Sequence, residues 1–275
     1  MRFAVVGHVE WVQFARVAEV PAAGEVVHAS ETWEQAAGGG AVAAVQLAKL
    51  AGEATLFTAL GDDELGHRAL DELTAHGVRV EAVFGERRQR RAFTLIDATG
   101  ERTISVLDER LVPSGEDPLP WAELAHADGV YFTAGDRGAL EAARRGRRLI
   151  ATARTLLALA EAQIELDALV GSARDAAESY QPGDLRPPPR ALVTTDGSAG
   201  GTYLCADGHG GAYQAAPLEA SIGDAYGCGD SFAAGLTFGL GSDLGIADAL
   251  ALAARCGAAC LTGRGAYEGQ LRVRD

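Results

Sequence analysis

The stretch that decides the fold is Gly223-Asp224-Ala225-Tyr226-Gly227-Cys228-Gly229-Asp230-Ser231-Phe232-Ala233-Ala234-Gly235. A glycine-rich loop runs here directly into an amphipathic helix, which carries Phe232, Leu236 and Leu240 on one side. The first backbone N–H groups of a helix have no partner within it, and the helix dipole adds partial positive charge at that end. The stretch therefore predicts a binding site for an anion such as phosphate.

Asp230 lies at this predicted anion site, where a second negative charge is unfavourable unless the carboxylate has a task. Accepting the proton of a hydroxyl that attacks a phosphoryl group is one such task. The alternative is structural, with Asp230 capping the helix after the glycine turn. The local pattern leaves both interpretations open.

Outward from this stretch, strand-like and helix-like patterns alternate along most of the chain, which predicts βαβ units and a mostly parallel sheet. Buried strands are expected at 2–7, 54–60, 129–133, 149–151, 166–170 and 191–195. Helices are expected at 41–51, 64–76, 137–145, 156–162, 229–240 and 246–262. We expect a single α/β domain over residues 1–275.

Two segments, about 12–36 and 80–108, interrupt the alternation. The second contains three short strand patterns, at 80–84, 92–97 and 103–107, with a glycine turn between the last two. Period-2 patterns separated by such turns predict a small antiparallel sheet set apart from the parallel one. A small sheet projecting over the strand ends would form a lid.

The composition limits the partners. A net charge of −14 over 275 residues argues against nucleic acid as the main partner. No apolar run approaches the length of a membrane span, and the first residues lack the layout of a signal peptide. The 4 cysteines are scattered without CxxC spacing, which suits a reducing compartment. We expect a cytoplasmic protein that acts on small molecules.

Several motifs resemble, in order and through nearly the whole chain, those of the ribokinase-like (PfkB) sugar kinases. The 223–235 stretch is similar to the family signature D-T-T-G-A-G-D-S-F-x-A-G-F. Further similarities are Gly38-Gly39-Gly40-Ala41-Val42, Gly61-Asp62-Asp63-Glu64-Leu65-Gly66, Gly100-Glu101-Arg102-Thr103 and Thr195-Asp196-Gly197-Ser198-Ala199-Gly200. The resemblance implies a three-layer αβα fold with a β-sheet lid, and ATP-dependent phosphorylation of a small-molecule hydroxyl.

The same resemblance implies roles for individual residues. Asp230 would be the catalytic base, and the amides of Gly227, Cys228 and Gly229 would form the anion hole for the transferring phosphate. The ATP site would be lined by Thr195, Gly197, Gly200 and Asp224. The substrate would be bound by His8, Glu10, Gly38, Gly39 and Gly40. Mg²⁺ would accompany ATP, and relatives often pair through their lids, so a homodimer is expected.

The chain also departs from the family pattern. Glu10 and Val12 stand where sugar-phosphorylating relatives carry an Asn and an Asp, and Val42 replaces the Asn of the glycine motif. Valine cannot pair with a hydroxyl, so we expect ribose and fructose to be poor substrates. The magnesium motif N-x-x-E is represented only by the sequence 172–175, Ser-Ala-Arg-Asp, and the metal ligands stay unassigned. Ala225 lacks the oxygen of a monovalent-cation site.

Two alternative functions remain open. The intact Asp230 and glycine loop favour an enzyme, whereas Val12 and Val42 favour a non-catalytic relative that binds a nucleotide or metabolite as a sensor. Residues 38–43 also fit a G-x-G-x-x-A dinucleotide fingerprint, which would indicate an oxidoreductase. That fingerprint does not lie in the first βαβ turn, so it ranks third.

Overall fold

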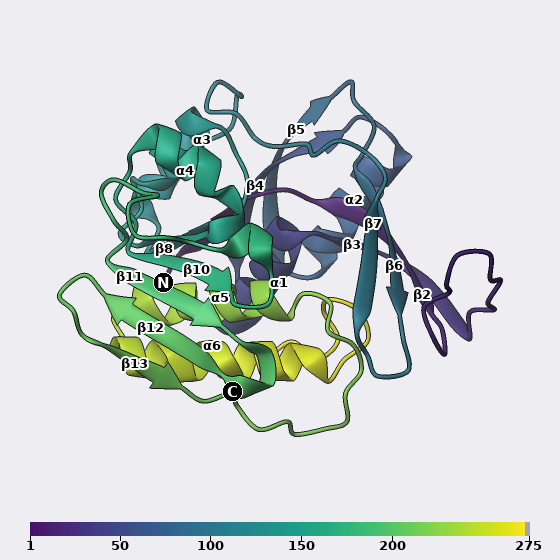
Figure 1. Cartoon of the computed structure of the whole chain (residues 1–275). Coiled ribbons are helices and arrows are strands. Elements are labelled where there is room, and N and C mark those ends of the chain that lie inside the picture. The colour runs from purple at the N-terminus through teal and green to yellow at the C-terminus, as the bar shows by residue number, and fades with distance from the viewer. Residues whose placement is uncertain (273–275) are drawn as a thin grey trace.

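The central sheet has nine strands in the order β13-β12-β11-β10-β9-β8-β1-β4-β5 (Figure 1). The strands from β11 to β5 run parallel, and β12 and β13 add antiparallel pairs at one edge. The structure is a computed structural model that describes residues 1–272. The strands of this sheet are β1 Phe3–Val6, β4 Ala54–Gly61, β5 Val78–Gly85, β8 Gly129–Phe132, β9 Leu149–Thr152, β10 Ala168–Ser172, β11 Ala191–Thr195, β12 Gly201–Cys205 and β13 Gly210–Tyr213.

Helices cover both faces of the sheet and complete three layers. Four of them, α1, α2, α5 and α6, share one apolar core with one face, while α3, α4 and η1 share a second core with the other. The helices are α1 Gly39–Ala51, α2 Glu64–Ala75, η1 Trp121–His126, α3 Arg137–Ala143, η2 Ala153–Thr155, α4 Leu156–Ala162, η3 Ala176–Glu178, η4 Gly197–Ala199, α5 Cys228–Gly241 and α6 Ile246–Leu261. The predicted three-layer α/β fold is confirmed.

Small residues determine how closely the helices of the first layer pack. The helix α5 contacts α6 along its length, and a Cβ on Gly235 would lie only 2.8 Å from Cys256 Sγ of α6. The close packing places α5 directly below the sheet, with its N-terminus at the edge where the parallel strands end (Figure 1). The ends of parallel strands at a sheet edge are where ligands bind in open α/β folds.

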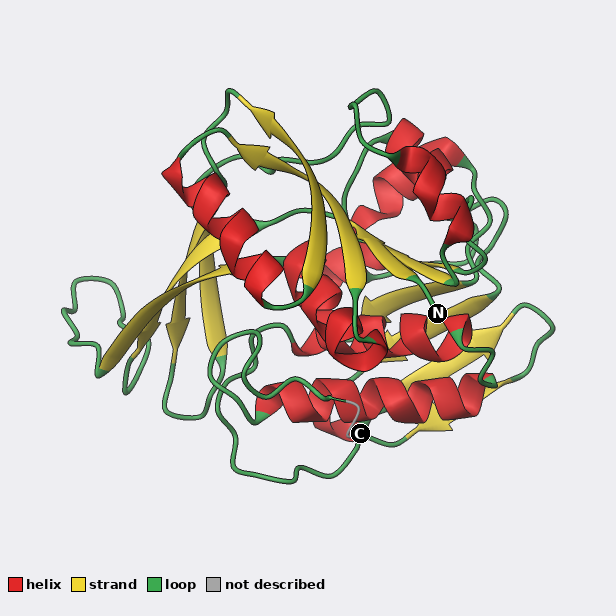
Figure 2. Cartoon of the chain, turned by 180° about the vertical axis from the view of Figure 1, so that it is seen from behind, coloured by secondary structure: helices red, strands yellow, loops and turns green. Residues whose placement is uncertain are grey.

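A second sheet of four strands, in the order β3-β2-β6-β7, projects from one side of the body (Figure 2). Its strands are β2 Glu10–Arg16, β3 Glu31–Ala37, β6 Arg91–Ile96 and β7 Arg102–Val106. We call these four strands the lid. Two of its three pairings are antiparallel, but the central pair of β2 and β6 is parallel. Parallel pairing follows because both strands enter the lid from the main sheet in the same direction.

One part of the predicted lid is wrong. The strand pattern at 80–84 belongs to β5, which pairs with β4 in parallel at the edge of the main sheet. This strand follows β4 and α2 as an ordinary βαβ unit, and its half-buried pattern arises because it is an edge strand. Alternating burial is common to edge strands and lid strands, so the pattern alone cannot separate the two.

Candidate active site

The loop before α5 holds the first turn of that helix open to the outside. Gly227 precedes the helix with φ +78°, a left-handed conformation that favours glycine, and its carbonyl accepts the N–H of Ser231 at 2.9 Å. A Cβ on Gly227 would also lie 2.8 Å from Cγ1 of Val42. The amides of Cys228 and Gly229 precede that first helical bond, so they are free to bind an anion.

Asp230 is the third residue of α5 and is not its cap. Gly227 occupies the N-cap position, and no side chain caps the helix there. The interpretation of Asp230 as an N-cap is therefore wrong. Its carboxylate instead points toward α1, because a Cβ on Gly39 would lie 2.9 Å from Asp230 Oδ1 and 3.0 Å from Thr133 Oγ1. Only a glycine at position 39 leaves room for this carboxylate.

The electrostatic environment of Asp230 suits a proton acceptor. Desolvation, together with the charges of Glu178 and Glu10, raises the pKa of Asp230 to about 6, against the opposing effect of Arg154 and Arg102. A base whose pKa lies near the working pH is unprotonated at pH 7 and still basic enough to accept a proton. Arg102 begins β7 and brings a positive charge of the lid within electrostatic reach of Asp230.

Asp224 supports the loop and does not face a ligand. Its side chain is fully buried, and its two oxygens accept the N–H groups of Tyr226 at 3.0 Å and Gly265 at 2.6 Å. Desolvation raises the pKa of Asp224. In this structure the Asp224 side chain faces its own loop, and its place in the ATP site stays a prediction. Asp224 stabilises the turn before α5 through these hydrogen bonds, which gives this position of the signature a structural role.

On the acceptor side, His8 and Glu10 form a buried polar group with Thr133 and Arg90. His8 Nε2 lies 3.5 Å from Glu10 Oε1, and His8 Nδ1 lies 3.4 Å from Thr133 Oγ1. Arg90 Nε lies 2.9 Å from Glu10 Oε1, and His8, Glu10 and Arg90 are all less than 10% exposed. These residues lie beside Asp230, because Thr133 contacts both His8 and the Gly39 turn.

Burial sets the charges of this group. Desolvation lowers the pKa of His8, so its imidazole is neutral at pH 7. Desolvation acts in the opposite direction on Glu10, but the hydrogen bond with His8 and the charges of Arg90 and Arg110 hold the pKa of Glu10 below its usual value. Glu10 is thus ionised, and it is the carboxylate that faces the two arginines.

The glycine turn 38–40 lies against His8 and Glu10, as the resemblance implied. A Cβ on Gly38 would lie 3.1 Å from Glu10 Cγ, and the Gly40 N–H donates to the His8 carbonyl at 3.1 Å. The Gly38 N–H already donates to the Tyr226 hydroxyl at 3.3 Å, so Tyr226 links the two glycine loops. The Gly38 N–H is therefore occupied before any substrate binds.

Val12 and Val42 are core residues. Both side chains are fully buried, Val12 in the lid core and Val42 beneath Gly227. Their substitution for polar residues removes hydroxyl partners from the acceptor side and adds apolar packing in exchange. The structure thus gives these valines a packing role.

The predicted nucleotide loop follows β11 at the same edge of the sheet. Thr195 ends that strand and its hydroxyl donates to the Gly171 carbonyl at 3.2 Å. Gly200 has φ +85°, and a Cβ there would lie 2.1 Å from the Tyr213 carbonyl oxygen. Gly197 has φ +55° and lies against the Arg174 guanidinium, which pairs with Asp196 at 2.9 Å. The exposed turn at Gly197 remains the predicted position for ATP.

Two carboxylates at η3 come from the segment that resembles the magnesium motif. Asp175 is the N-cap of η3 and Glu178 is its last residue, and both pair with Arg154. Within residues 1–272 there is no group of three or more His, Cys, Asp or Glu side chains arranged as a metal site. Mg²⁺ usually takes only one or two protein carboxylates and fills its coordination with water and substrate phosphates, so such a site needs no larger group of ligands.

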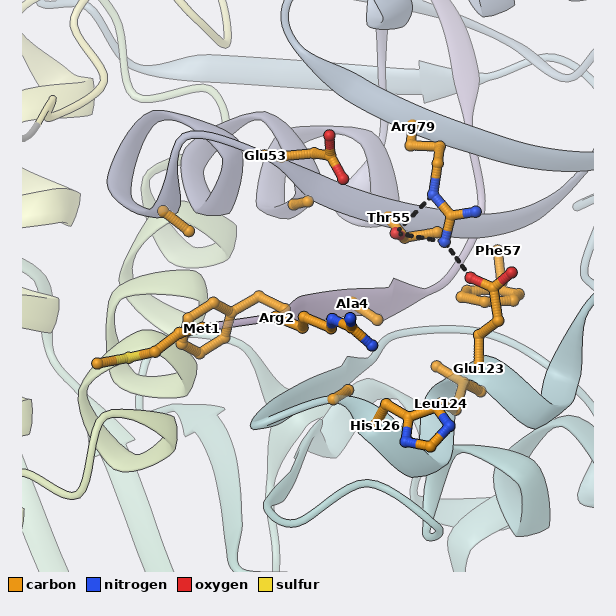
Figure 3. Close-up of a pocket in the computed structure, with 14 residues that line it drawn as sticks. Met1, Arg2, Ala4, Glu53, Thr55, Phe57, Arg79, Glu123, Leu124 and His126 are labelled. Carbon is orange, nitrogen blue, oxygen red and sulfur yellow. Dashed lines mark hydrogen bonds and ion pairs between the residues drawn. The ribbon is translucent and has the colours of Figure 1, made fainter.

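The dinucleotide fingerprint and a cavity at the other edge of the sheet are not part of this candidate site. The dinucleotide fingerprint at 38–43 follows β3 of the lid, whereas that motif requires a strand of the parallel sheet. A cavity of about 370 Å³ opens at the amino ends of β1 and β4, where Arg79 contacts Thr55 and Glu123 (Figure 3). It lies at the opposite edge of the sheet from Asp230.

Sequence reasoning missed several residues of the site: Thr133, Tyr226, Arg90, Arg110, Arg154 and Glu178. Thr133 carried a usable signal, because it follows a buried strand and such strand ends meet at the ligand-binding edge. Arg90 lies within the run 86–91, which reads as an exposed charged turn, and only tertiary contacts bury it. Arg154 and Glu178 lie in the short helices η2 and η3, where the sequence offered no clear motif.

A phosphate-binding helix terminus beside an unprotonated carboxylate defines an enzyme that transfers a phosphoryl group to a hydroxyl. The model of the pfkB family carbohydrate kinases matches residues 2–155 and 147–272. The chain belongs to this family, which makes it an ATP-dependent kinase of small molecules.

Several solved structures share the fold of this chain. Ribokinase from Thermotoga maritima is 17% identical, with a TM-score of 0.80 over 99% of this chain and 96% of that one. Arabidopsis thaliana ribokinase, solved with ribose and ATP, is 17% identical, with a TM-score of 0.76 over 98% and 96%. Adenosine kinase from Sinorhizobium meliloti is 18% identical, with a TM-score of 0.76 over 96% and 95%.

A comparison with the curated proteins finds no match. Among the helices of residues 1–272, none combines the length and the apolar character needed to span a membrane.

Proposed function

We propose that this chain transfers the γ-phosphate of ATP to a hydroxyl of a sugar, a nucleoside or a related metabolite, with Asp230 as the general base. The observation that carries the proposal is the position of Asp230, in the same first helical turn as the free amides and next to Gly39 and Thr133. Its pKa of about 6 supports the same role. The Arabidopsis thaliana and Sinorhizobium meliloti proteins named above are a ribokinase and an adenosine kinase, which are kinases of a sugar and of a nucleoside.

The geometry supports an in-line transfer in which each part has one task. Asp230 accepts the proton of the attacking hydroxyl, and the hydroxyl oxygen forms the new bond to phosphorus while the bond to ADP breaks. The amides of Gly227, Cys228 and Gly229 stabilise the charge that develops on the transferring group. Because these amides are fixed by the helix, they need no reorganisation during the reaction.

Mg²⁺ would be held by the ATP phosphates, with Asp175 and Glu178 as the protein carboxylates nearest to it. When bound, it supplies charge neutralisation between the phosphates. Arg154 neutralises both carboxylates in the structure, and its guanidinium stays close enough to Asp230 to lower the pKa of that residue.

The lid would close over the acceptor and exclude water, which protects ATP from hydrolysis. Homodimer formation through the lid is supported by β7, an edge strand whose residues are all exposed and which carries Ile104 and Val106. Four free cysteines suit the cytoplasm.

The sensor alternative rested on Val12, Val42 and the weak magnesium motif at 172–175, and the structure accounts for the two valines as packing residues. A sensor has no use for a carboxylate with a pKa near 6 beside an anion-binding helix terminus. Both points favour the enzyme.

An ADP-release screen with Mg²⁺-ATP over sugars, sugar acids, sugar phosphates and nucleosides tests the proposal. We expect at least one compound to stimulate ADP release, and the signal to disappear when EDTA removes the metal. Tight ATP binding without ADP release for any compound would favour the sensor.

A further inference from the structure

The lid contacts the loop that leads into α5 through Arg16, the last residue of β2. That loop, residues 222–226, directly precedes the amides at the start of α5. Nη1 of Arg16 donates to the carbonyl of Gly223 at 3.1 Å, and Nη2 lies 3.9 Å from Oδ2 of Asp224. A guanidinium of the lid is therefore in contact with the segment before the predicted anion hole.

The turn between the lid strands β6 and β7 contacts the same loop through its backbone. The Ala225 N–H donates to the carbonyl of Gly100 at 2.9 Å. A Cβ on Gly100 would lie 2.7 Å from Cγ2 of Ile222 and 3.3 Å from the carbonyl oxygen of Gly223. The lid thus meets the 222–226 loop at two places, and Arg16 supplies a charged contact between them.

Asp224 is the group of this loop that needs a cation. Its side chain is fully buried, and its oxygens accept the N–H groups of Tyr226 at 3.0 Å and Gly265 at 2.6 Å. A buried carboxylate is costly unless it is both hydrogen-bonded and paired with a positive charge. Within residues 1–272, Arg16 is the single basic side chain at ion-pair distance from Asp224.

The strand β3 fixes the direction of the Arg16 side chain. The guanidinium lies over the Trp33 ring, 6.0 Å from its centroid, and Nε lies 3.7 Å from Oε2 of Glu31. Glu31 has a closer partner in Arg264, at 2.7 Å, so Glu31 does not hold Arg16 alone. The Arg16 side chain therefore extends along the lid onto the 222–226 loop, and 28% of it is exposed.

We propose that Arg16 is a positioning residue for phosphoryl transfer, which holds the 222–226 loop and with it the amides of Gly227, Cys228 and Gly229 in the geometry that stabilises the transferring phosphate. These amides act through their fixed directions. A displacement of about 1 Å in such a group can cost about 100-fold in rate. This inference rests on the proposed kinase function and adds a residue that does not itself touch the phosphate.

Arg16 belongs to the lid, so the geometry of the anion hole depends on where the lid lies. A lid that moved away from the body would withdraw the guanidinium from Gly223 and Asp224. The loop would then lose its charged contact, and transfer of the phosphate to water in the open enzyme would be disfavoured.

The variants Arg16→Ala and Arg16→Lys test this role, and Arg68→Ala is the matched control. Arg68 of α2 lies over the Trp11 ring at 4.4 Å and pairs with Glu34 at 3.6 Å, so it contacts the lid as Arg16 does but from outside the 222–226 loop. We expect Arg16→Ala to lower kcat by about 10- to 100-fold and to change the KM for ATP by less than about threefold. Arg16→Lys should recover part of the loss because it keeps the charge, and Arg68→Ala should keep the parental kcat.

A small guanidinium compound provides a readout that general destabilisation would not produce. Methylguanidinium chloride at millimolar concentration is compared with sodium chloride at the same ionic strength. We expect methylguanidinium to restore part of the kcat of Arg16→Ala and to have no effect on Arg68→Ala. Equal recovery with sodium chloride would overturn the assignment of the effect to a guanidinium.

Hydrogen exchange needs no acceptor, so it separates failure of this inference from failure of the kinase function. The reporters are the amides of Ala225, Tyr226 and Gly265, which form the hydrogen bonds of the loop, and the amides of β1 are the internal standard. We expect the reporters to exchange about tenfold faster in Arg16→Ala and at the parental rate in Arg68→Ala.

Faster exchange at the reporters in Arg16→Ala, with β1 unchanged, supports the inference even if no compound is phosphorylated. Parental exchange at these amides overturns it, whatever the turnover. An equal fall in kcat in the two alanine variants also overturns it. A rise in the KM for ATP with unchanged kcat would assign Arg16 to nucleotide binding and overturn it as well.

Discussion

The candidate site has a phosphate end and an acceptor end, and the two are formed by different parts of the chain: backbone groups at the first and side chains at the second. At the phosphate end, backbone amides of the α5 N-terminus and the conformation of Gly227 provide the binding surface, and side chains contribute little. At the acceptor end, side chains from distant segments meet, among them His8, Glu10 and Arg90. A backbone site needs a fixed local sequence, whereas a side-chain site needs only a fixed fold that can hold different residues.

This difference explains why the phosphate end resembles the family and the acceptor end departs from it. ATP is common to the reaction, so its site is constrained by the chemistry of phosphate. The acceptor site determines which molecule is chosen, and a few side-chain changes suffice to alter that choice.

The strongest test of the phosphate end is Asp230→Asn. Asn has nearly the same size but is not basic, so we expect kcat to fall by about 10²- to 10⁴-fold. The amides stay in place, and calorimetry should give an ATP affinity close to that of the parent. A variant that keeps more than about a tenth of the parental turnover would show that Asp230 is not the base.

The variant Gly227→Ala tests whether the phosphate end depends on the backbone conformation of Gly227. Gly229→Ala is its control, and both variants are compared in unfolding experiments. An alanine at 227 must adopt φ +78° and contact Val42 at 2.8 Å, so we expect a loss of about 2–4 kcal/mol in the free energy of unfolding. A Cβ at Gly229 meets no atom within 4 Å. Equal urea midpoints for the two variants would contradict the strained-loop explanation.

The pH dependence of kcat reports on the protonation of Asp230. Its pKa of about 6 lies above the usual value, so protonation on lowering the pH through 6 removes the base. We expect kcat to fall about tenfold per unit below pH 6. The pKa of Glu10 is lowered by the hydrogen bond with His8 and the nearby arginines, so this carboxylate stays ionised over this range. A flat profile from pH 7 to pH 5 would contradict the assignment.

The smallest effect is expected from Cys228→Ala. Contact with the Cys260 thiol and burial raise the pKa of Cys228, so its thiol is neutral, and only its backbone N–H serves the phosphate. We expect kcat and the KM for ATP to change by less than about threefold. The corresponding truncation at the acceptor end, His8→Ala, should raise the acceptor KM and leave the KM for ATP unchanged. If both truncations affect ATP alike, the division between the two ends is wrong.

Most of the fold could be predicted from the sequence, because periodicity and strand-helix alternation are local properties. The α4 helix and β11 lie at the predicted residues, and the other main-sheet strands and helices differ from prediction only at their ends. The exceptions are β5, whose sheet depends on its partner, and β12 and β13, whose short patterns among Gly and Tyr gave no clear period. Sheet membership is a tertiary property that a single strand does not encode.

The site divides in the same way. Asp230 and the glycine loops could be found from sequence, because their spacing along one segment determines their geometry. The motif position of Asp224 did not reveal that its side chain faces the loop. Arg90 could not be found, because it is 80 residues from Glu10 in the sequence and contacts it only through folding.

The chain passes between the main body and the lid four times, from β1 to β2, β3 to α1, β5 to β6 and β7 to β8. The first three passages carry His8, Gly38 and Arg90, each of which lies against Glu10. Closure of the lid, as proposed above, would bend the chain at these passages. An acceptor bound against these three residues would hold the lid where it joins the main body, so that substrate binding and lid closure would be coupled.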